Sequence, residues 1–204
     1  MPLRNRVTPW GEIVAVPARG TLMGNRGGCL HDDERRLGRV RWRSAAWICC
    51  LLEFKERRRQ VMRPGHYTEL FFLDEATALA AGHRPCAECR RAEFEAFRRA
   101  WATAHGGVPP RAPEMDRILH GERVGEGGAK RRHLLPGEGR DVLELPDGVM
   151  VEIGGAAWRV GAEGLRRWSA DGYGPPLPRP DGPVFMLTPP AIAAVLAAGY
   201  RPRS

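Results

Sequence analysis

The chain has 204 residues, enough for one domain or two small ones with a real core. Its net charge of +8 and pI near 9.9 favour an anionic partner, of which nucleic acid is the commonest. No run of about 18 apolar residues occurs, and the N-terminus lacks the apolar segment of a signal peptide, so we expect a cytoplasmic protein without a membrane partner. Nearly all basic residues are arginine, which is also typical of a GC-rich genome, so a solvated basic surface is the alternative.

Residues 1–38 form a loop-rich opening segment in which a cysteine and a histidine lie close together. Cys29 and His31 follow a pair of glycines, which permit the tight turn that a metal-binding knuckle needs. The five cysteines are an odd number and two are adjacent, which does not suit a secreted disulfide framework. In a reducing compartment such cysteines favour metal ligation.

Residues 39–73 carry the signals of extended structure. In residues 39–43 arginines alternate with Val40 and Trp42, which predicts a basic strand, and residues 45–54 and 67–73 predict two more strands. Arginines neutralise phosphates and an exposed tryptophan stacks on bases, so we expect a nucleic-acid surface here. The alternative is a core Trp42 beside solvated arginines. The residues predicted for this surface are Arg39, Arg41, Trp42, Arg43, Arg57 and Arg58.

The most informative stretch, residues 70–101, places two cysteines at metal-ligand spacing. A short helix over 74–81 is expected to end at Gly82, and Pro85 fixes the backbone before Cys86 and Cys89. Apolar residues at helical spacing then predict an amphipathic helix that ends near residues 105–107. The Cys-x-x-Cys pair favours a metal over the alternative of a redox dithiol.

This stretch resembles the metal-binding domain at the front of Ada-type methylated-DNA repair proteins, which is also attached to some bacterial nucleases. The resemblance implies a zinc module and a link to DNA. The chain departs from the pattern because it lacks the Cys-x3-Cys pair and has Arg90 where a proline usually follows the second cysteine. The methyl-acceptor role is therefore not carried over to any cysteine. The matching residues are Phe71, Phe72, Glu75, Ala76, Ala80, Ala81, Gly82, Arg84, Pro85, Cys86 and Cys89.

A closed zinc site needs two further ligands besides Cys86 and Cys89. Cys49 and Cys50 are neighbours in a predicted strand, so their side chains face opposite sides and at most one reaches the ion. His83 lies too close before Cys86 and is interpreted as a surface or packing residue. Thiolate and imidazole ligands suit Zn²⁺. The predicted set is Cys29, His31, Cys86 and Cys89, with Cys49 or Cys50 in place of His31 as the main alternative.

A short helix over 113–123 holds the candidates for catalysis. Asp116 and His120 are four residues apart on one helical face, where the carboxylate could orient the imidazole as a general base or share a divalent ion, and Glu122 lies nearby. The alternative is an ordinary solvated helix. The sequence lacks a His-Asn-His arrangement, a Gly-x-Ser-x-Gly elbow and a phosphate-binding loop.

The last 65 residues predict strands around two turns, a proline-rich connection over 175–183, a strand at 184–187 and a final helix. The motif Leu-Ala-Ala-Gly-x-Arg-Pro occurs at 79–85 and again at 196–202, which we interpret as two helix ends in preference to a duplication.

Together these patterns predict an α+β fold in which a zinc-stapled, treble-clef-like hairpin-and-helix module, residues 1–107, precedes a smaller strand-rich region, residues 108–204. The expected function is zinc-dependent binding of nucleic acid, most simply DNA. The alternatives are a DNA-processing enzyme of nuclease or base-repair type, and a zinc-stabilised protein-interaction module.

Overall fold

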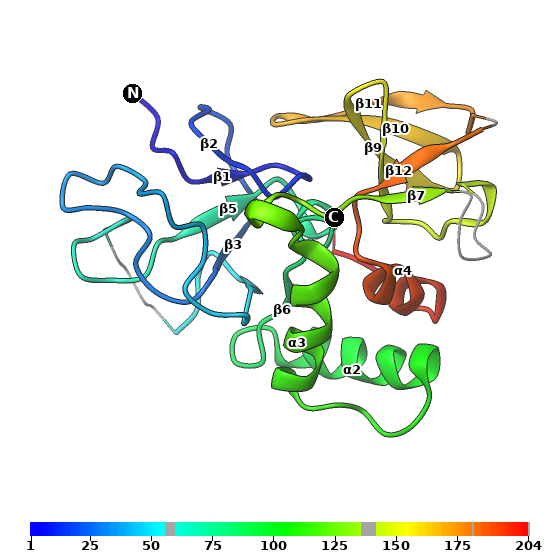
Figure 1. The fold of residues 1–204 in the computed structure, drawn as a ribbon, viewed down its shortest axis with the longest axis horizontal. Helices are drawn as coiled ribbons and strands as arrows, with labels where there is room; N and C mark the ends of the chain where they lie inside the picture. The colour runs from blue at the N-terminus through cyan, green and yellow to red at the C-terminus, as the bar shows by residue number, and fades with distance from the viewer. Residues whose placement is uncertain (56–59, 136–141, 181, 204) are drawn as a thin grey trace.

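The structure, a computed structural model, describes residues 1–55, 60–135, 142–180 and 182–203. Its fold is mixed α+β, as predicted, with two sheets and four α-helices within these ranges. Figure 1 shows the two sheets on opposite sides of the molecule, with helical ribbons grouped below and between them. The helices are α1 (Glu75–Ala80), α2 (Arg91–His105), α3 (Ala112–Arg123) and α4 (Pro190–Ala197), and two 3₁₀ turns are η1 (Glu126–Gly128) and η2 (Val142–Glu144).

The first sheet is built by the N-terminal half and is mixed, because two of its strand pairs are parallel and the other three are antiparallel. Side chains alternate across it, so Leu22 and Phe72 are buried in a core under the sheet while Met23 and Phe71 point to the other face. In sheet order its strands are β2 (Ile13–Val14), β1 (Arg6–Val7), β5 (Leu70–Phe72), β3 (Leu22–Asn25), β4 (Ile48–Cys50) and β6 (Arg84–Pro85).

The second sheet comes from the C-terminal part and is antiparallel throughout. The segment predicted as a proline-rich connection contributes an edge strand, which is a correction. Prolines are tolerated there because one side of an edge strand needs no backbone donor, and Pro175 and Pro176 lie in it. In sheet order the strands are β11 (Gly172–Leu177), β10 (Gly164–Ser169), β9 (Ala156–Gly161), β8 (Met150–Ile153), β12 (Val184–Met186) and β7 (His133–Leu135).

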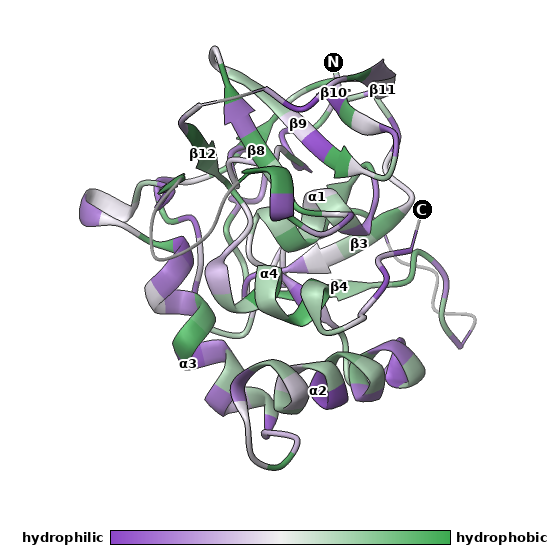
Figure 2. Ribbon diagram, turned by 90° about the vertical axis from the view of Figure 1, so that its right-hand side faces the viewer, coloured by the Kyte–Doolittle hydropathy of each residue, from purple (hydrophilic) through white to green (hydrophobic). Residues whose placement is uncertain are grey.

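The largest core joins the helices to the second sheet. Helix α2 is amphipathic (Figure 2), and its buried Phe97 and Trp101 pack with Leu119 of α3, Leu196 of α4 and Val151 of β8. Packing therefore runs across residue 107, where the sequence predicts a domain boundary. No described helix has the length and apolarity needed to cross a bilayer.

The repeated motif forms the same helix end twice. Gly82 after α1 and Gly199 after α4 both have positive φ, at 89° and 102°. In each case the next residue, His83 or Tyr200, donates its N–H to a carbonyl five residues back, at 2.9 and 3.2 Å. This is the pattern of a glycine-terminated helix, so the interpretation as two helix ends holds.

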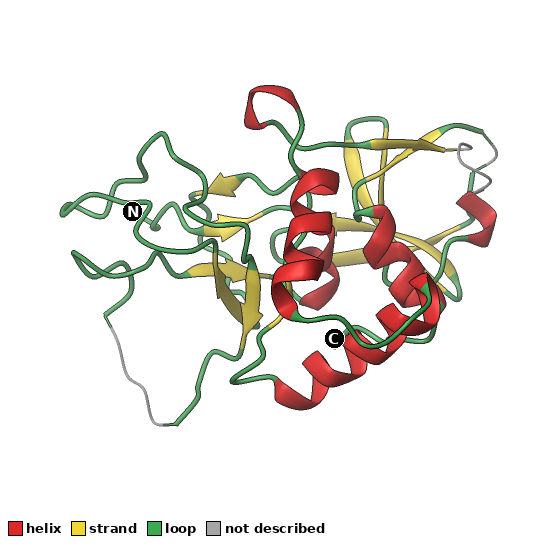
Figure 3. Cartoon of the chain, turned by 60° about the horizontal axis from the view of Figure 1, so that its bottom comes forward, coloured by secondary structure: helices red, strands yellow, loops and turns green. Residues whose placement is uncertain are grey.

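The basic strand predicted over 39–43 is a loop, which is a second correction. The N–H groups of Arg43 and Ser44 both donate to the carbonyl of Arg26, at 2.8 and 3.2 Å, which anchors the end of this loop, and residues 39–43 are in no strand. Val40 is 42% exposed. Figure 3 shows how much of the N-terminal half is loop, and the two apolar strands predicted beside this segment shrink to β4 and β5.

Candidate metal centre

Three cysteines from two parts of the chain meet at one edge of the first sheet. The Sγ atoms of Cys50, Cys86 and Cys89 lie within 4.8 Å of one another. Cys50 is the last residue of β4, and Cys86 and Cys89 lie in the turn between β6 and α2. No further His, Cys, Asp or Glu of the described chain joins the group. Three sulfur ligands at this spacing could hold one metal ion.

The geometry follows from the pairing of β4 with β6. Cys49 lies opposite Pro85, and the N–H of Cys86 donates to the carbonyl of Cys49 at 2.9 Å, which brings the turn beside the end of β4. The N–H of Glu88 donates to the Cys86 Sγ at 3.4 Å, and the N–H of Arg90 donates to the Cys86 carbonyl at 3.2 Å. Such a turn presents both sulfur atoms of a Cys-x-x-Cys pair to one side.

The three cysteines line a cavity of about 620 Å³ over the outer face of the first sheet. Ile48 and Cys50 of β4, Met23 of β3 and Phe71 of β5 share this face because side chains alternate along each strand. Four more apolar residues line the cavity, Leu51, Leu52, Phe54 and Val61, and its polar members are Asn25, Glu53, Tyr67, Glu69 and Glu88. The sulfur cluster is therefore accessible from a mainly apolar cavity.

Hydrogen bonding inside the cluster makes two of the thiols acidic. The hydrogen bond from Cys50, together with the backbone N–H groups of Cys89 and Glu88, lowers the pKa of Cys86 to about 5 despite burial. The same Cys50 thiol lowers the pKa of Cys89, and these hydrogen bonds and burial raise the pKa of Cys50. The cluster thus favours the thiolate form that a metal ion requires.

A buried ion pair holds the turn that carries Cys86 and Cys89 in place. Arg90, which stands where the Ada-type pattern has a proline, places its Nη2 2.7 Å from the Glu75 Oε2, and both side chains are fully buried. The two Glu75 oxygens also accept from the Tyr200 hydroxyl and the Arg203 N–H, both at 2.7 Å. Through Glu75, Arg90 therefore connects the turn that carries Cys86 and Cys89, called the metal turn below, to α1 and to the C-terminal segment.

Cys49 and His83 point away from the cluster. Cys49 is fully buried in the core under the first sheet, where burial raises the pKa of its thiol, and its Sγ accepts from the Arg90 Nη1 at 3.5 Å. His83 is also fully buried and packs against Phe72 and Trp47 at centroid distances of 4.7 and 5.2 Å. The prediction that Cys49 and Cys50 face opposite sides agrees with this arrangement.

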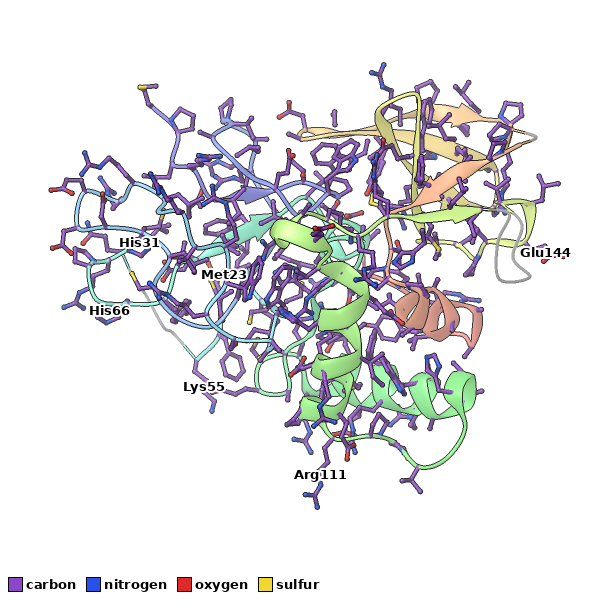
Figure 4. The ribbon with its side chains drawn as sticks, in the orientation of Figure 1. Met23, His31, Lys55, His66, Arg111 and Glu144 are labelled. Atoms are coloured by element: carbon purple, nitrogen blue, oxygen red, sulfur yellow. The ribbon has the colours of Figure 1, made fainter. Side chains whose placement is uncertain are left out.

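Cys29 and His31, the predicted partners of Cys86 and Cys89, form a separate pair, which corrects the preferred ligand set. The His31 Nε2 donates to the Arg63 carbonyl at 3.3 Å, and its Nδ1 lies 2.6 Å from the Thr68 hydroxyl, so both ring nitrogens are occupied. The Cys29 Sγ is 3.1 Å from the His31 carbonyl. Figure 4 shows His31 among the outer N-terminal loops, beyond Met23 of the cysteine cavity. The alternative ligand Cys50 takes the place in the cluster.

The three candidates for catalysis each serve the fold and do not line the cysteine cavity. Asp116 accepts two hydrogen bonds from Arg84, both at 2.8 Å, so its carboxylate is a buried ion-pair partner. The Nδ1 of His120 lies 3.2 Å from the Arg123 Nη2, and burial and this guanidinium lower the pKa of His120. The Glu122 Oε2 accepts from the Ala191 N–H at the start of α4, at 2.9 Å.

The predicted nucleic-acid residues divide into two groups. Arg39 and Arg43 are exposed, whereas Arg41 and Trp42 are half-buried and line a second cavity. Arg57 and Arg58 lie outside the described residues.

Comparisons of the chain with protein-family models, curated proteins and solved structures find no match. The resemblance of residues 70–101 to the Ada-type domain therefore stays a prediction.

Proposed function

We propose that this protein binds Zn²⁺ through Cys50, Cys86 and Cys89 and that it acts on, or binds to, nucleic acid. The observation that supports the zinc centre best is the three-cysteine cluster itself, with two acidic thiols at the start of a helix. Zinc is the preferred ion because it takes sulfur ligands in a tetrahedral arrangement and needs no redox change. A strand-borne cysteine followed by a Cys-x-x-Cys turn and a helix is the order expected of a treble-clef-like module.

Three protein ligands leave one corner of a tetrahedron for water or another ligand, as in catalytic zinc sites. Because all three cysteines line the 620 Å³ cavity, that corner is proposed to face it. A bound zinc would supply a Lewis acid and keep its thiolates nucleophilic. This open position favours, as a second candidate, the DNA-processing enzyme over a purely structural centre.

The nucleic-acid partner is supported by charge. The chain carries +8 overall, and exposed Arg39 and Arg43 flank half-buried Arg41 and Trp42 on one loop. A loop of this composition can contact phosphates with its guanidinium groups and a base with its indole.

The zinc centre is tested by replacing zinc with cobalt. We expect sulfur-to-cobalt absorption and the visible bands of a tetrahedral ion, and a small exogenous ligand such as azide should shift the visible bands because the fourth position is open. The same spectra of a Cys29→Ser protein should be unchanged. Visible bands that do not respond to azide would indicate a closed site. If the wild-type protein shows no such bands after addition of cobalt, the proposed centre is refuted.

The nucleic-acid proposal is tested by the salt dependence of DNA and RNA binding. Release of counterions makes the logarithm of the binding constant fall linearly with the logarithm of salt, with a slope of about −0.9 per phosphate contacted on duplex DNA. An Arg39→Gln, Arg43→Gln protein should lose about two units of that slope. Absence of binding at low salt, to single and double strands alike, would overturn the proposal.

A further inference from the structure

A second cavity, of about 430 Å³, lies where the first sheet meets the second. The two parts are joined beside it by a hydrogen bond of 2.6 Å from the Trp10 Nε1 to the Glu152 Oε2 on β8. Its wall differs from that of the cysteine cavity because it is dominated by cations and indole rings. The residues that define this cation pocket are Arg26, Arg41, Trp42, Trp47, Arg123 and Lys130.

Two guanidinium groups at the base of the cation pocket are buried without a counter-ion. Arg26 and Arg123 are 2% and 1% exposed, and within the described chain neither they nor Lys130 forms an ion pair with a carboxylate. They donate instead to carbonyls: Arg26 to Gly11 at 2.9 Å, Arg123 to Gly82 at 2.7 Å and Lys130 to Ala80 at 2.6 Å. The Arg123 Nε is buried with no hydrogen-bond partner.

Placing unpaired charges together in a protein interior is unfavourable. Burial, with repulsion from Arg123 and Arg41, lowers the pKa of Arg26 to about 9, and burial lowers the pKa of Arg123 to the same value, against the attraction of Asp116. Burial and repulsion from Arg123 and Arg26 lower the pKa of Lys130 to about 7, against the attraction of Glu122. The cation pocket therefore has a strongly positive potential that an anion would relieve.

The acidic residues of the wall do not supply that anion. Glu152 accepts from Arg132 at 2.9 Å with one oxygen and from Trp10 with the other, so it is already engaged. Glu12 is exposed at the rim. Four basic side chains, those of Arg26, Arg41, Arg123 and Lys130, remain to face a ligand. Four cations suit a dianion better than a single carboxylate.

The indole rings give the cation pocket a second kind of recognition. Trp47 has the guanidinium carbons of Arg26 and Arg123 at 3.9 and 4.0 Å from its ring, so it is covered by cations. Trp42 is half-buried, 5.9 Å from Trp47 between centroids. A Cβ on Gly128 would come within 3.0 Å of the Trp42 ring, so glycine lets this loop close over the indole. Trp42 lines the pocket and is only half-buried, so the exposed part of its indole is within reach of a flat ring bound there.

We propose that the cation pocket binds the phosphate monoester of a nucleotide, either free or at the 5′ end of a strand. The dianionic phosphate lies among Arg26, Arg123 and Lys130, and the base stacks on Trp42. This site goes beyond the zinc centre and does not depend on it. Binding of a 5′ phosphate at the end of a strand rests on the proposed nucleic-acid function, whereas binding of a free nucleotide does not.

Calorimetric titration of the metal-replete protein tests the proposal with four probes. These are AMP, adenosine, and one short oligonucleotide with either a 5′ phosphate or a 5′ hydroxyl. We expect AMP to bind and adenosine not to bind. A preference for the 5′-phosphorylated strand would identify a strand end as the source of the phosphate, whereas binding of AMP with no such preference would identify a free nucleotide.

Lys130→Met removes one cation, and Lys55→Met is a matched control because the chain has only these two lysines. Lys55 is exposed, on a loop labelled in Figure 4, and does not line the cation pocket. Loss of a charged hydrogen bond should weaken AMP binding about 10- to 100-fold in Lys130→Met. We expect a change below about twofold in the control, as for most surface charges. Trp42→Ala should weaken AMP but leave inorganic phosphate unchanged.

A measurement on the wild-type protein avoids any effect of substitution on folding. If AMP occupies the cation pocket, it should slow acetylation of Lys130 and leave acetylation of exposed Lys55 unchanged. The proposal is overturned if AMP at millimolar concentration neither binds nor protects Lys130, or if Lys130→Met and Lys55→Met lose affinity equally. Salt-dependent DNA binding that persists in either case would leave the proposed nucleic-acid function standing.

Discussion

Buried arginines are paired with carboxylates beside the cysteine turn but have no such partner in the cation pocket of the described chain. Around the metal turn, Arg84 binds Asp116 and Arg90 binds Glu75, both with nearly inaccessible side chains. In the cation pocket, Arg26 and Arg123 are buried as deeply, but within the described chain they contact carbonyls, the Trp47 ring and the histidines His83 and His120. A charge whose role is to hold the fold has its counter-ion in the fold. We infer that a charge without one is kept for a ligand.

The largest effect is expected from breaking a pair. Glu75→Ala would leave Arg90 buried and unpaired and would remove the acceptor for Tyr200 and Arg203, so we expect a loss of about 3–5 kcal/mol in the free energy of unfolding. Urea denaturation measures this, with Glu163→Ala, in an exposed pair with Arg166, as the control that should change by less than about 1 kcal/mol. Equally small losses of unfolding free energy in Glu75→Ala and Glu163→Ala would contradict the view that the buried pair holds the fold together.

The second pair separates a structural role from a catalytic one. Asp116→Asn keeps an acceptor for Arg84 but removes the charge, so we expect a loss of about 2–3 kcal/mol in stability. Any activity found for the protein should fall only in proportion to the folded fraction. A variant of wild-type stability with a specific loss of activity would restore Asp116 as a catalytic candidate.

Replacing an unpaired cation should increase the free energy of unfolding, whereas breaking an ion pair decreases it. Lys130 has a folded-state pKa near 7 against 10.5 for an ordinary lysine, so between these values the unfolded chain binds more protons and stability rises with pH. We expect Lys130→Met to raise the free energy of unfolding by roughly 1–2 kcal/mol at pH 7, a gain that shrinks as pH rises towards 10. Urea denaturation at pH 6, 7 and 9 shows this, and a gap that does not change with pH would contradict it.

The smallest effect is expected at the cysteine that faces the core. Cys49→Ala removes a small buried side chain, so we expect a loss of about 1 kcal/mol with zinc content unchanged. Thermal denaturation and metal analysis of the same sample measure both quantities. Loss of zinc from this protein would mean that Cys49, and not Cys50, contributes the sulfur from β4.

The sequence predicted the parts of the cysteine site that depend on local pattern. The Cys-x-x-Cys turn, the glycine-terminated helix before it and the amphipathic helix after it follow from spacings of a few residues. The third ligand was harder to choose because Cys50 lies in an apolar run, where a cysteine is usually a small core residue. Alternation in the strand limited the choice to one of two neighbours, and only the pairing of β4 with β6 decides it.

The cation pocket has no local pattern that could predict it. Its cations come from the residue after β3, the loop that follows, the last turn of α3 and the loop before β7, and only the packing of α3 and that last loop against the N-terminal half brings them together. Arg41 and Trp42 were singled out as nucleic-acid residues on a strand that does not form. Arg123 donates to backbone carbonyls such as that of Gly82, and because every residue has a carbonyl, the sequence gives no sign of this contact.

The central claim is that Cys50, and not the pair Cys29 and His31, completes the metal centre with Cys86 and Cys89. Zinc content of the purified wild-type, Cys50→Ser and Cys29→Ser proteins, measured by mass spectrometry after dialysis, tests it most directly. The proposed zinc centre predicts about one zinc per chain in the wild-type and Cys29→Ser proteins and a large loss in Cys50→Ser. Full zinc in Cys50→Ser together with loss in Cys29→Ser would contradict the account.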